Sequence, residues 1–198
     1  MAKRLFDFLI AAAALLLAAP LMLAIAAWIK LDSRGPVLFR QDRVGRHGRV
    51  FRIHKFRTMR HDPSDRGLQI TVGGDARITR VGQLLRGSKL DELPQLIDVL
   101  QGTMSLVGPR PEVPRYLPFY PPALRDKILS VRPGITDLAS IEYRRESELL
   151  ASADDPERAY VEQVLPEKLR YAEQYVDCAS LWMDIRLLCR TLRAVLTH

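Results

Sequence analysis

The sequence predicts an α+β fold, in which a mostly helical domain with one small β-hairpin is attached to an N-terminal membrane helix and to interfacial amphipathic helices. Three observations predict it. An uncharged apolar run covers residues 8–29. The segment 35–56 alternates apolar and polar residues about a glycine-containing turn, which is typical of a hairpin. Most later segments repeat their apolar residues with helical spacing.

The apolar run is long enough to cross a membrane, because a straight helix of this length measures roughly 33 Å against a hydrocarbon core of about 30 Å. A single transmembrane helix is therefore one interpretation. A cleaved signal peptide is a second, since Ala24, Ile25 and Ala26 resemble a cleavage site.

Two features favour a third interpretation, a re-entrant helix. Pro20 stands in the middle of the run, where a proline removes a backbone hydrogen bond and breaks or kinks a helix. Basic residues flank both ends, Lys3 and Arg4 before the run and Lys30 after it, and the positive-inside rule assigns such flanks to the cytoplasm. We expect residues 1–31 to form a re-entrant membrane helix broken near Pro20, and 32–198 a cytosolic domain at the membrane surface.

Charge narrows the possible partners. The 198 residues carry 30 Lys and Arg against 23 Asp and Glu, a net charge of +7, which suits an anionic partner. No nucleic-acid recognition motif or stacking platform accompanies this charge, so we expect acidic lipid or a phosphorylated substrate and no nucleic acid. The two cysteines, Cys178 and Cys189, have neither disulfide-framework nor metal-site spacing, which fits a reducing compartment.

The remaining elements follow from local patterns. A loop is expected at 61–75, rich in Pro, Gly, Ser and Asp, and irregular chain at the proline-dense 107–122. A turn and a short strand are expected within 132–142. Helices are expected at 77–86, from the Asp91–Glu92 pair to Gly102, at 123–131, 155–177 and 180–196. The last has one apolar side and one basic side, so it either lies on an anionic membrane or packs on the core.

The adjacent carboxylates Asp91 and Glu92 precede Pro94, which is tolerated only in the first turn of a helix. Acidic residues at a helix start are common caps, and taken singly this pair is no more than that. The same pair also suits phosphoryl chemistry, in which one carboxylate attacks phosphorus and another holds Mg²⁺.

Arginines would then bind the phosphate oxygens, and Arg86 and Arg110 are the candidates nearest in sequence. The prolines on either side of Arg110 would fix its loop in advance. Lys55 and Arg57, in the segment KFRTM, are further candidates for binding substrate phosphate, or else the polar end of the hairpin.

Taken together, these motifs resemble those of a known family, the bacterial sugar transferases that are monotopic phosphoglycosyl transferases. The resemblance runs from about Lys3 to the C-terminus. It rests on KRLFDFLIA, GPVLFRQDRVG, FRIHKFRTM, DARITRVGQLLR, SKLDELPQLIDVLQGTMSLVGPRP and RPGIT. The long central block is the most specific of these.

The resemblance implies that Asp91 and Glu92 are catalytic and bind Mg²⁺, and that Arg86 and Arg110 bind phosphate. It implies that Asp91 attacks the β-phosphorus of a UDP-sugar, releases UMP and passes the phosphosugar to polyprenol (undecaprenyl) phosphate. It also implies a re-entrant helix broken at the proline that matches Pro20, at the cytoplasmic face of the bacterial inner membrane. The sequence indicates neither the sugar nor the oligomeric state.

One alternative comes from another class of protein. A non-catalytic anchor or scaffold at the membrane surface would explain the apolar N-terminus, the net charge and the basic last helix. It would not explain why two carboxylates and a proline-bracketed arginine occur together.

Overall fold

The computed structural model describes residues 1–60, 75–142 and 146–196. The loop expected at 61–75 therefore lies outside the described residues, apart from Asp75. The helices are α1 (Ala2–Asp32), α2 (Arg80–Gly87), α3 (Gln95–Gln101), α4 (Pro122–Ile128), α5 (Leu138–Glu142), α6 (Glu146–Ala151), α7 (Pro156–Ala159), α8 (Leu165–Cys178) and α9 (Leu181–Leu196). The strands are β1 (Leu38–Val44), β2 (Val50–Phe56), β3 (Ser105–Val107) and β4 (Gly134–Thr136). Short helical turns are η1 (Arg46–Gly48), η2 (Leu90–Glu92), η3 (Pro114–Phe119) and the π-helical η4 (Tyr160–Val164).

The predicted α+β class is confirmed, since the protein is mostly helical with little sheet. The expected hairpin is β1 paired antiparallel with β2, from Leu38 opposite Phe56 to Val44 opposite Val50. A second, parallel pair joins β3 to β4, and only the latter strand was expected. At this crossing a Cβ on Gly134 would lie 2.1 Å from the amide nitrogen of Gly108, so only glycine fits there.

Two segments differ from expectation. The proline-dense segment contains the 3₁₀ helix η3, although it was expected to be irregular. The long helix expected at 155–177 is interrupted by η4, where Leu165 N–H donates to the carbonyl five residues back, that of Tyr160. Pro166 follows at once; it has no N–H to offer Glu162, so an α-helical hydrogen bond is missing there.

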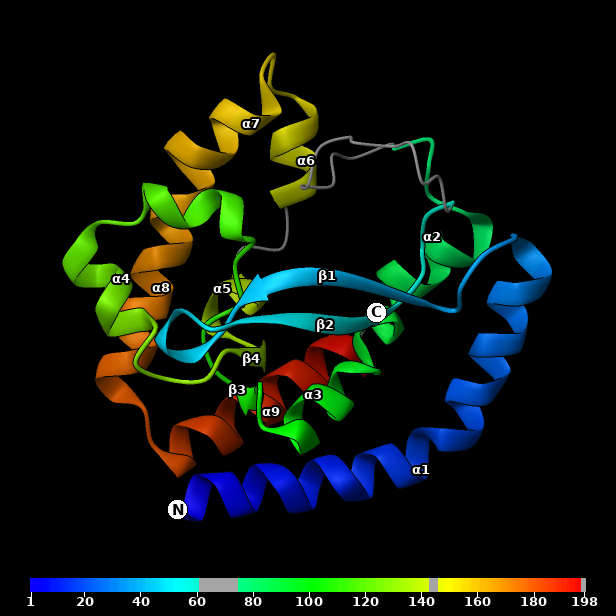
Figure 1. The fold of residues 1–198 in the computed structure, drawn as a ribbon, viewed down its shortest axis with the longest axis horizontal. Helices are drawn as coiled ribbons and strands as arrows, with labels where there is room; N and C mark the ends of the chain where they lie inside the picture. Colours follow the sequence, from blue (N-terminus) through cyan, green and yellow to red (C-terminus); the bar gives the residue numbers. More distant parts are fainter. Residues whose placement is uncertain (61–74, 143–145, 197–198) are drawn as a thin grey trace.

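Among the described residues, the buried apolar side chains form three clusters. Figure 1 shows the β1–β2 hairpin crossing the middle, with α3 and α9 between it and α1, and α8 on the far side from α2. The first cluster joins η3, α4 and the α7–α8 run, the second joins α1, α3, β3 and α9, and the third joins the end of α1 to β2 and α2. Both halves of α1 thus pack on the rest of the chain.

Helix α1 is continuous through Pro20, so the expected break takes the form of a bend rather than of two separate helices. Figure 1 shows the helix running beneath α3 and α9 and then turning to pass beside α2. A proline is the commonest cause of such a change of direction, because it leaves one carbonyl of the preceding turn without its N–H partner.

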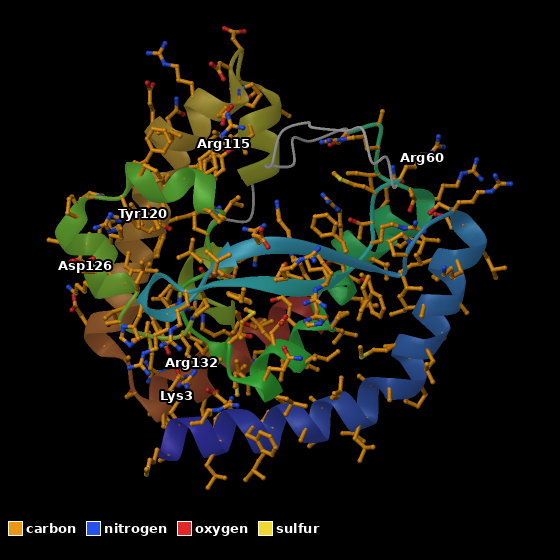
Figure 2. All side chains as sticks on the ribbon, viewed as in Figure 1. Lys3, Arg60, Arg115, Tyr120, Asp126 and Arg132 are labelled. Atoms are coloured by element: carbon orange, nitrogen blue, oxygen red, sulfur yellow. The ribbon has the colours of Figure 1, made fainter. Side chains whose placement is uncertain are left out.

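Within the described residues, α1 is the one helix long and apolar enough to cross a membrane. Apolar side chains point away from the body all along it (Figure 2). The exposed large apolar residues of α1 are Leu5, Phe8, Leu9, Ile10, Leu16, Leu17, Leu21, Leu23, Trp28 and Leu31.

Of the two alternatives for the last helix, packing on the core is observed for one side of α9. One side of α9 packs on the core, through Asp184 at 0% exposure and Leu187 at 1%. Another side keeps Leu181, Trp182 and Leu192 exposed. The predicted apolar stripe therefore straddles the boundary between core and surface, because the buried Asp184 takes a core position that apolar periodicity does not reveal.

Polar contacts join the start of α1 to α9, β3 and α3. Lys3 Nζ lies 2.6 Å from Asp184 Oδ2 of α9 and donates to the carbonyl of Val107 in β3. Asp7, 2% exposed, accepts a hydrogen bond of 2.7 Å from the hydroxyl of Ser105. Arg4 donates to the last carbonyls of α3, those of Val99 and Leu100. These basic residues therefore hold the fold together, besides any role as membrane flanks.

Candidate active site

The candidate site forms where β2, η2, the loop after β3 and the end of α2 meet. Lys55 comes from β2 and Arg86 from the last turn of α2, while Asp91 and Glu92 occupy η2. Arg110 follows β3 in the loop Gly108–Pro111. The fold thus brings together four of the predicted segments.

The register between these elements is fixed by a buried pair. Asp98 of α3, 1% exposed, accepts hydrogen bonds from His54 N at 2.9 Å and His54 Nδ1 at 2.7 Å. Because Lys55 follows His54 directly, this pair holds its side chain opposite the turn that precedes α3. Sequence reasoning missed Asp98; the one signal for it is a charged residue between apolar ones.

The carboxylates sit on a strained turn. Lys89, just before η2, has φ 59° and ψ 12°, the left-handed region that costs a non-glycine residue about 1 kcal/mol. Such strain persists where the surroundings enforce it, often at functional sites. The turn places Asp91 and Glu92 before the N-cap of α3, which is Pro94. The pair therefore does not itself cap the helix, as the sequence suggested it would.

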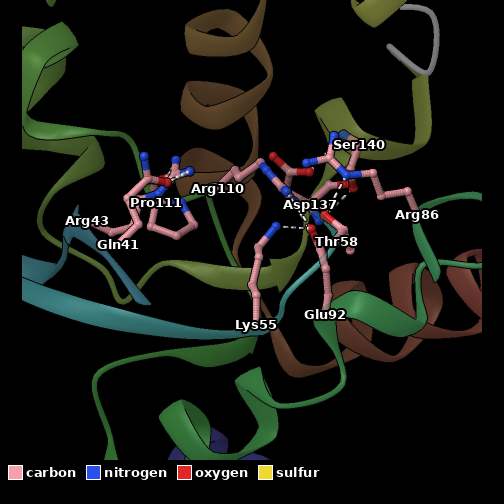
Figure 3. A network of polar contacts seen from close by, with 10 residues as sticks. All are labelled: Gln41, Arg43, Lys55, Thr58, Arg86, Glu92, Arg110, Pro111, Asp137 and Ser140. Carbon is pink, nitrogen blue, oxygen red and sulfur yellow. Dashed lines mark hydrogen bonds and ion pairs between the residues drawn. The ribbon is translucent and has the colours of Figure 1, made fainter. Parts of the chain in front are cut away.

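Glu92 is held by two cations. Its Oε1 lies 2.7 Å from Lys55 Nζ and 2.5 Å from Arg110 Nη2 (Figure 3). Burial alone would raise the pKa of Glu92, but the charges of Arg110 and Lys55 outweigh it and hold that pKa well below its ordinary range. Glu92 is therefore ionised at neutral pH and fixes both cations in place.

Asp91 is in the opposite situation. It is 7% exposed, and the described part of the chain provides no hydrogen bond to its carboxylate. Burial raises the pKa of Asp91, and the positive charge of Lys55 offsets this only in part. A carboxylate that is desolvated, close to positive charge and without a hydrogen-bond donor retains lone pairs for another atom.

Arg86 lies near this carboxylate. Its Nε donates to the hydroxyl of Thr58 at 2.8 Å, which fixes the guanidinium at the end of β2. Helix α2 approaches so closely that a Cβ on Gly82 would meet the carbonyl oxygen of Thr58 at 2.0 Å. The charge of Asp91 acts on the pKa of Arg86, although burial dominates and lowers that pKa.

Arg57 does not join this cluster. Its side chain is buried, at 4% exposure, and points to the C-terminal end of α1. There it donates to the carbonyls of Ser33 at 2.7 Å and Arg34 at 2.5 Å, and to the hydroxyl of Ser33 at 3.0 Å. Arg57 therefore binds the backbone that follows the last turn of α1 and points away from the cluster of Lys55, Arg86 and Arg110.

Further polar residues extend the network beyond those predicted. Figure 3 includes Gln41 and Arg43 of β1 and Asp137 and Ser140 near α5. Ser140 N–H donates to Asp137 Oδ1 at 2.7 Å, which makes a compact turn after β4. None of these four residues was predicted as a site residue, although Gln41 and Arg43 lie in the motif GPVLFRQDRVG. The packing of β1 and β4 beside the loop brings them here.

The carboxylates suit one kind of metal site. No three His, Cys, Asp or Glu side chains gather as a metal-binding group among the described residues. Mg²⁺ is commonly held by one or two carboxylates together with substrate phosphates. Asp91 offers its free oxygens, and Glu92 Oε2 has only a 3.5 Å contact with Arg110 Nη1. The donor set thus fits a Mg²⁺ that arrives with a phosphorylated substrate.

The geometry as a whole combines a buried carboxylate with three fixed cations, Lys55, Arg86 and Arg110. That combination suits attack on a phosphorus atom whose oxygens need neutralising.

Comparison with known proteins agrees with this chemistry. The family model described as bacterial sugar transferase matches residues 1–198. A UDP-N-acetylgalactosamine-undecaprenyl-phosphate N-acetylgalactosaminephosphotransferase of Aeromonas hydrophila is 42% identical over 98% of this chain and 44% of its own length. A UDP-glucose:undecaprenyl-phosphate glucose-1-phosphate transferase of Caulobacter vibrioides is 37% identical over 98% of this chain and 70% of its own length.

The exopolysaccharide production protein PSS of Rhizobium leguminosarum bv. phaseoli is 38% identical over 99% of this chain and 96% of its own length. The chain spans less than half the length of the Aeromonas relative. The family model nevertheless covers every element described above, from α1 to α9. The chain belongs to the bacterial sugar transferase family.

Proposed function

We propose that the protein transfers a phosphosugar from a UDP-sugar to undecaprenyl phosphate and releases UMP. The names of the Aeromonas and Caulobacter relatives support this reaction type. The single observation that carries it in this chain is the contrast between the two carboxylates. Glu92 is paired with Lys55 and Arg110 through Oε1, whereas Asp91 is buried beside cations with no hydrogen-bond donor among the described residues.

In the first half-reaction, an Asp91 oxygen attacks the β-phosphorus of the UDP-sugar. The bond from that phosphorus to the bridging oxygen breaks, and UMP leaves with the electron pair. The product is an acyl phosphate that joins Asp91 to the phosphosugar. In the second half-reaction, a phosphate oxygen of undecaprenyl phosphate attacks the same phosphorus and releases the Asp91 carboxylate.

The neighbouring residues divide the remaining work. Glu92 holds Lys55 and Arg110 at fixed positions, where their N–H groups can bind the oxygens of the diphosphate. Arg86, anchored on Thr58, is placed to bind a phosphate from the other side. Asp91 and Glu92 would hold Mg²⁺, which when bound neutralises diphosphate charge and stabilises the leaving oxygen.

The membrane part of the proposal rests on α1. Its exposed apolar side chains suit burial in a bilayer, and the exposed Trp182 and Leu181 at the start of α9 lie where Lys3 of α1 meets Asp184. Since both halves of α1 pack on one domain, a re-entrant, monotopic helix is the topology that keeps both of its ends on one face. We place that domain at the cytoplasmic face of the inner membrane, where undecaprenyl phosphate presents its headgroup.

Topology is tested by labelling cysteines from outside intact cells, after replacing Cys178 and Cys189 by Ser. A cysteine at Ala2 and one at Ser33 should both stay unlabelled until the membrane is permeabilised. Labelling at Ala2 in intact cells would instead establish a single span.

The reaction is tested by UMP release from a panel of UDP-sugars with undecaprenyl phosphate and Mg²⁺. We expect release with one or a few sugars, lost in Asp91→Asn and after chelation of the metal. Glu92→Gln should keep the fold and lose most activity. UMP release by Asp91→Asn at the wild-type rate would exclude Asp91 as nucleophile. A non-catalytic anchor would bind anionic vesicles and release no UMP from any sugar.

A further inference from the structure

Glu112, two residues after Arg110, ties the loop to two other parts of the fold. Its Oε2 accepts a hydrogen bond of 2.6 Å from the hydroxyl of Tyr160. Its Oε1 accepts from the amide of Val113 at 2.8 Å, and its carbonyl accepts from the amide of Val44 at 2.8 Å. One residue therefore links the arginine-bearing loop to β1 and to the α7–α8 run.

The opposite side of the loop is held by Arg43 of β1. Its Nη1 donates to the carbonyl of Pro111 at 3.0 Å, and its Nη2 donates to Gln41 Oε1 at 2.7 Å (Figure 3). Arg110 is therefore preceded by the glycine crossing of β3 and β4 and followed by two anchored residues, Pro111 and Glu112.

Tyr160 reaches Glu112 because of the π-helical turn. It is the first residue of η4, is 2% exposed, and its ring lies 4.8 Å from that of Tyr116 between centroids. The turn widens just before Pro166, which cannot donate to the carbonyl of Glu162. An uninterrupted α-helix would turn this side chain in another direction, and π turns recur at functional sites for this reason.

We propose that Tyr160, acting through Glu112, is a positioning residue for Arg110. The hydroxyl fixes the Glu112 carboxylate, Glu112 fixes the loop backbone, and the loop presents the Arg110 guanidinium to Glu92 and to the substrate phosphate. This role rests on the proposed function, in which Arg110 binds the phosphate of the substrate. It extends the site to the C-terminal third of the chain, where no predicted site residue lies.

The test is Tyr160→Phe, which removes one oxygen and keeps the ring in the core. The matched control is Tyr116→Phe. Tyr116 belongs to the same cluster and its ring contacts that of Tyr160 at an interplanar angle of 52°, but its hydroxyl faces Glu157 at 3.4 Å. We expect Tyr160→Phe to lower kcat/KM for UMP release by about 10-fold, the loss of one hydrogen bond to a charged group. The control should stay near wild type.

A second arm separates positioning from packing. In an Arg110→Ala background, Tyr160→Phe should cost little further activity, because the residue through which it acts is gone. An equal loss of activity from Tyr160→Phe in the wild-type and Arg110→Ala backgrounds would overturn the proposal, because a residue that only packs in the core would have the same effect with or without Arg110.

A third arm does not depend on the reaction. Hydrogen exchange of the Val44 and Val113 amides, both of which donate to Glu112, should accelerate in Tyr160→Phe and not in Tyr116→Phe. Unchanged exchange in Tyr160→Phe would overturn the positioning role whatever the activity. If the wild-type protein releases no UMP but exchange still accelerates in Tyr160→Phe, the proposed function is wrong and the structural link from Tyr160 to the loop is supported.

Discussion

Arg57 offers the sharpest separation between a structural and a substrate-binding arginine. Sequence reasoning paired it with Lys55 as a phosphate ligand, but its guanidinium contacts Ser33 and Arg34 at the end of α1. In Arg57→Met, the part-buried hydrogen bonds to the carbonyls of Ser33 and Arg34 would lose their charged donor. Each such hydrogen bond contributes about 1.5–3 kcal/mol, and bonds to one group are not additive, so we expect a loss of about 3 kcal/mol.

That loss has a measurable size. For a chain of this length, 1 kcal/mol corresponds to about 2–4 °C in the unfolding midpoint, so Arg57→Met should lower the midpoint by about 6–12 °C. Thermal unfolding in lipid nanodiscs, monitored by tryptophan fluorescence, measures it. Arg57→Lys should recover part of the loss, because a lysine keeps the charge and lacks the planar fork that reaches several acceptors.

The kinetic constants should respond to the Arg110 substitution and not to the Arg57 substitution. Below its lowered midpoint, Arg57→Met should keep the wild-type KM for the UDP-sugar. Arg110→Met should leave the midpoint nearly unchanged, since its pair with Glu92 is partly exposed, and lower kcat/KM by about 100-fold. The reasoning would be refuted if Arg57→Met kept the wild-type midpoint and raised KM.

Three further outcomes follow from the site. Burial raises the pKa of Asp91, so the rate of UMP release should fall on acidification with a midpoint above the ordinary carboxyl pKa of about 3.9. Lys55→Met should move this midpoint to still higher pH. A midpoint at or below the ordinary value would contradict the burial of the nucleophile. Gly134→Ala should lower the free energy of unfolding by about 3 kcal/mol and reduce activity, because its Cβ would meet Gly108 at 2.1 Å and displace the loop that leads to Arg110. Denaturant unfolding should show a lower midpoint. An unchanged midpoint would contradict the close contact between Gly134 and Gly108. Arg4→Ala should destabilise α3 by about 1–2 kcal/mol through its last carbonyls, seen in hydrogen exchange of that helix, without changing the acid limb.

The local patterns of the chain predicted most of its elements. The alternating hairpin, the helix that ends at Gly102 and the basic helix before the carboxylates are all present. Their signals are short-range: turn glycines, capping residues and apolar spacing. The parallel pairing of β3 with β4 was out of reach, because three-residue strands far apart in sequence carry no such signal.

The site was predicted through motif resemblance rather than through periodicity. The candidate substrate-binding residues were inferred from the motifs, whereas the residues that hold their side chains in place were not. Asp98, Thr58 and Glu112 act through tertiary contacts whose partners lie 44, 28 and 48 residues away, and no local pattern encodes such distances. Arg57 shows the converse. Its position beside Lys55 in the sequence suggested a substrate-binding residue, whereas in the structure its side chain contacts the end of α1.

The central claim, a phosphosugar carried on Asp91, is tested most directly by intact mass spectrometry of the protein incubated with its UDP-sugar and Mg²⁺, without undecaprenyl phosphate. The account predicts one equivalent of released UMP and a mass increase equal to the phosphosugar, located on the peptide that contains Asp91 and removed when the lipid acceptor is added. Release of UMP only in the presence of acceptor, with no adduct in its absence, would contradict it and indicate direct transfer between the two substrates.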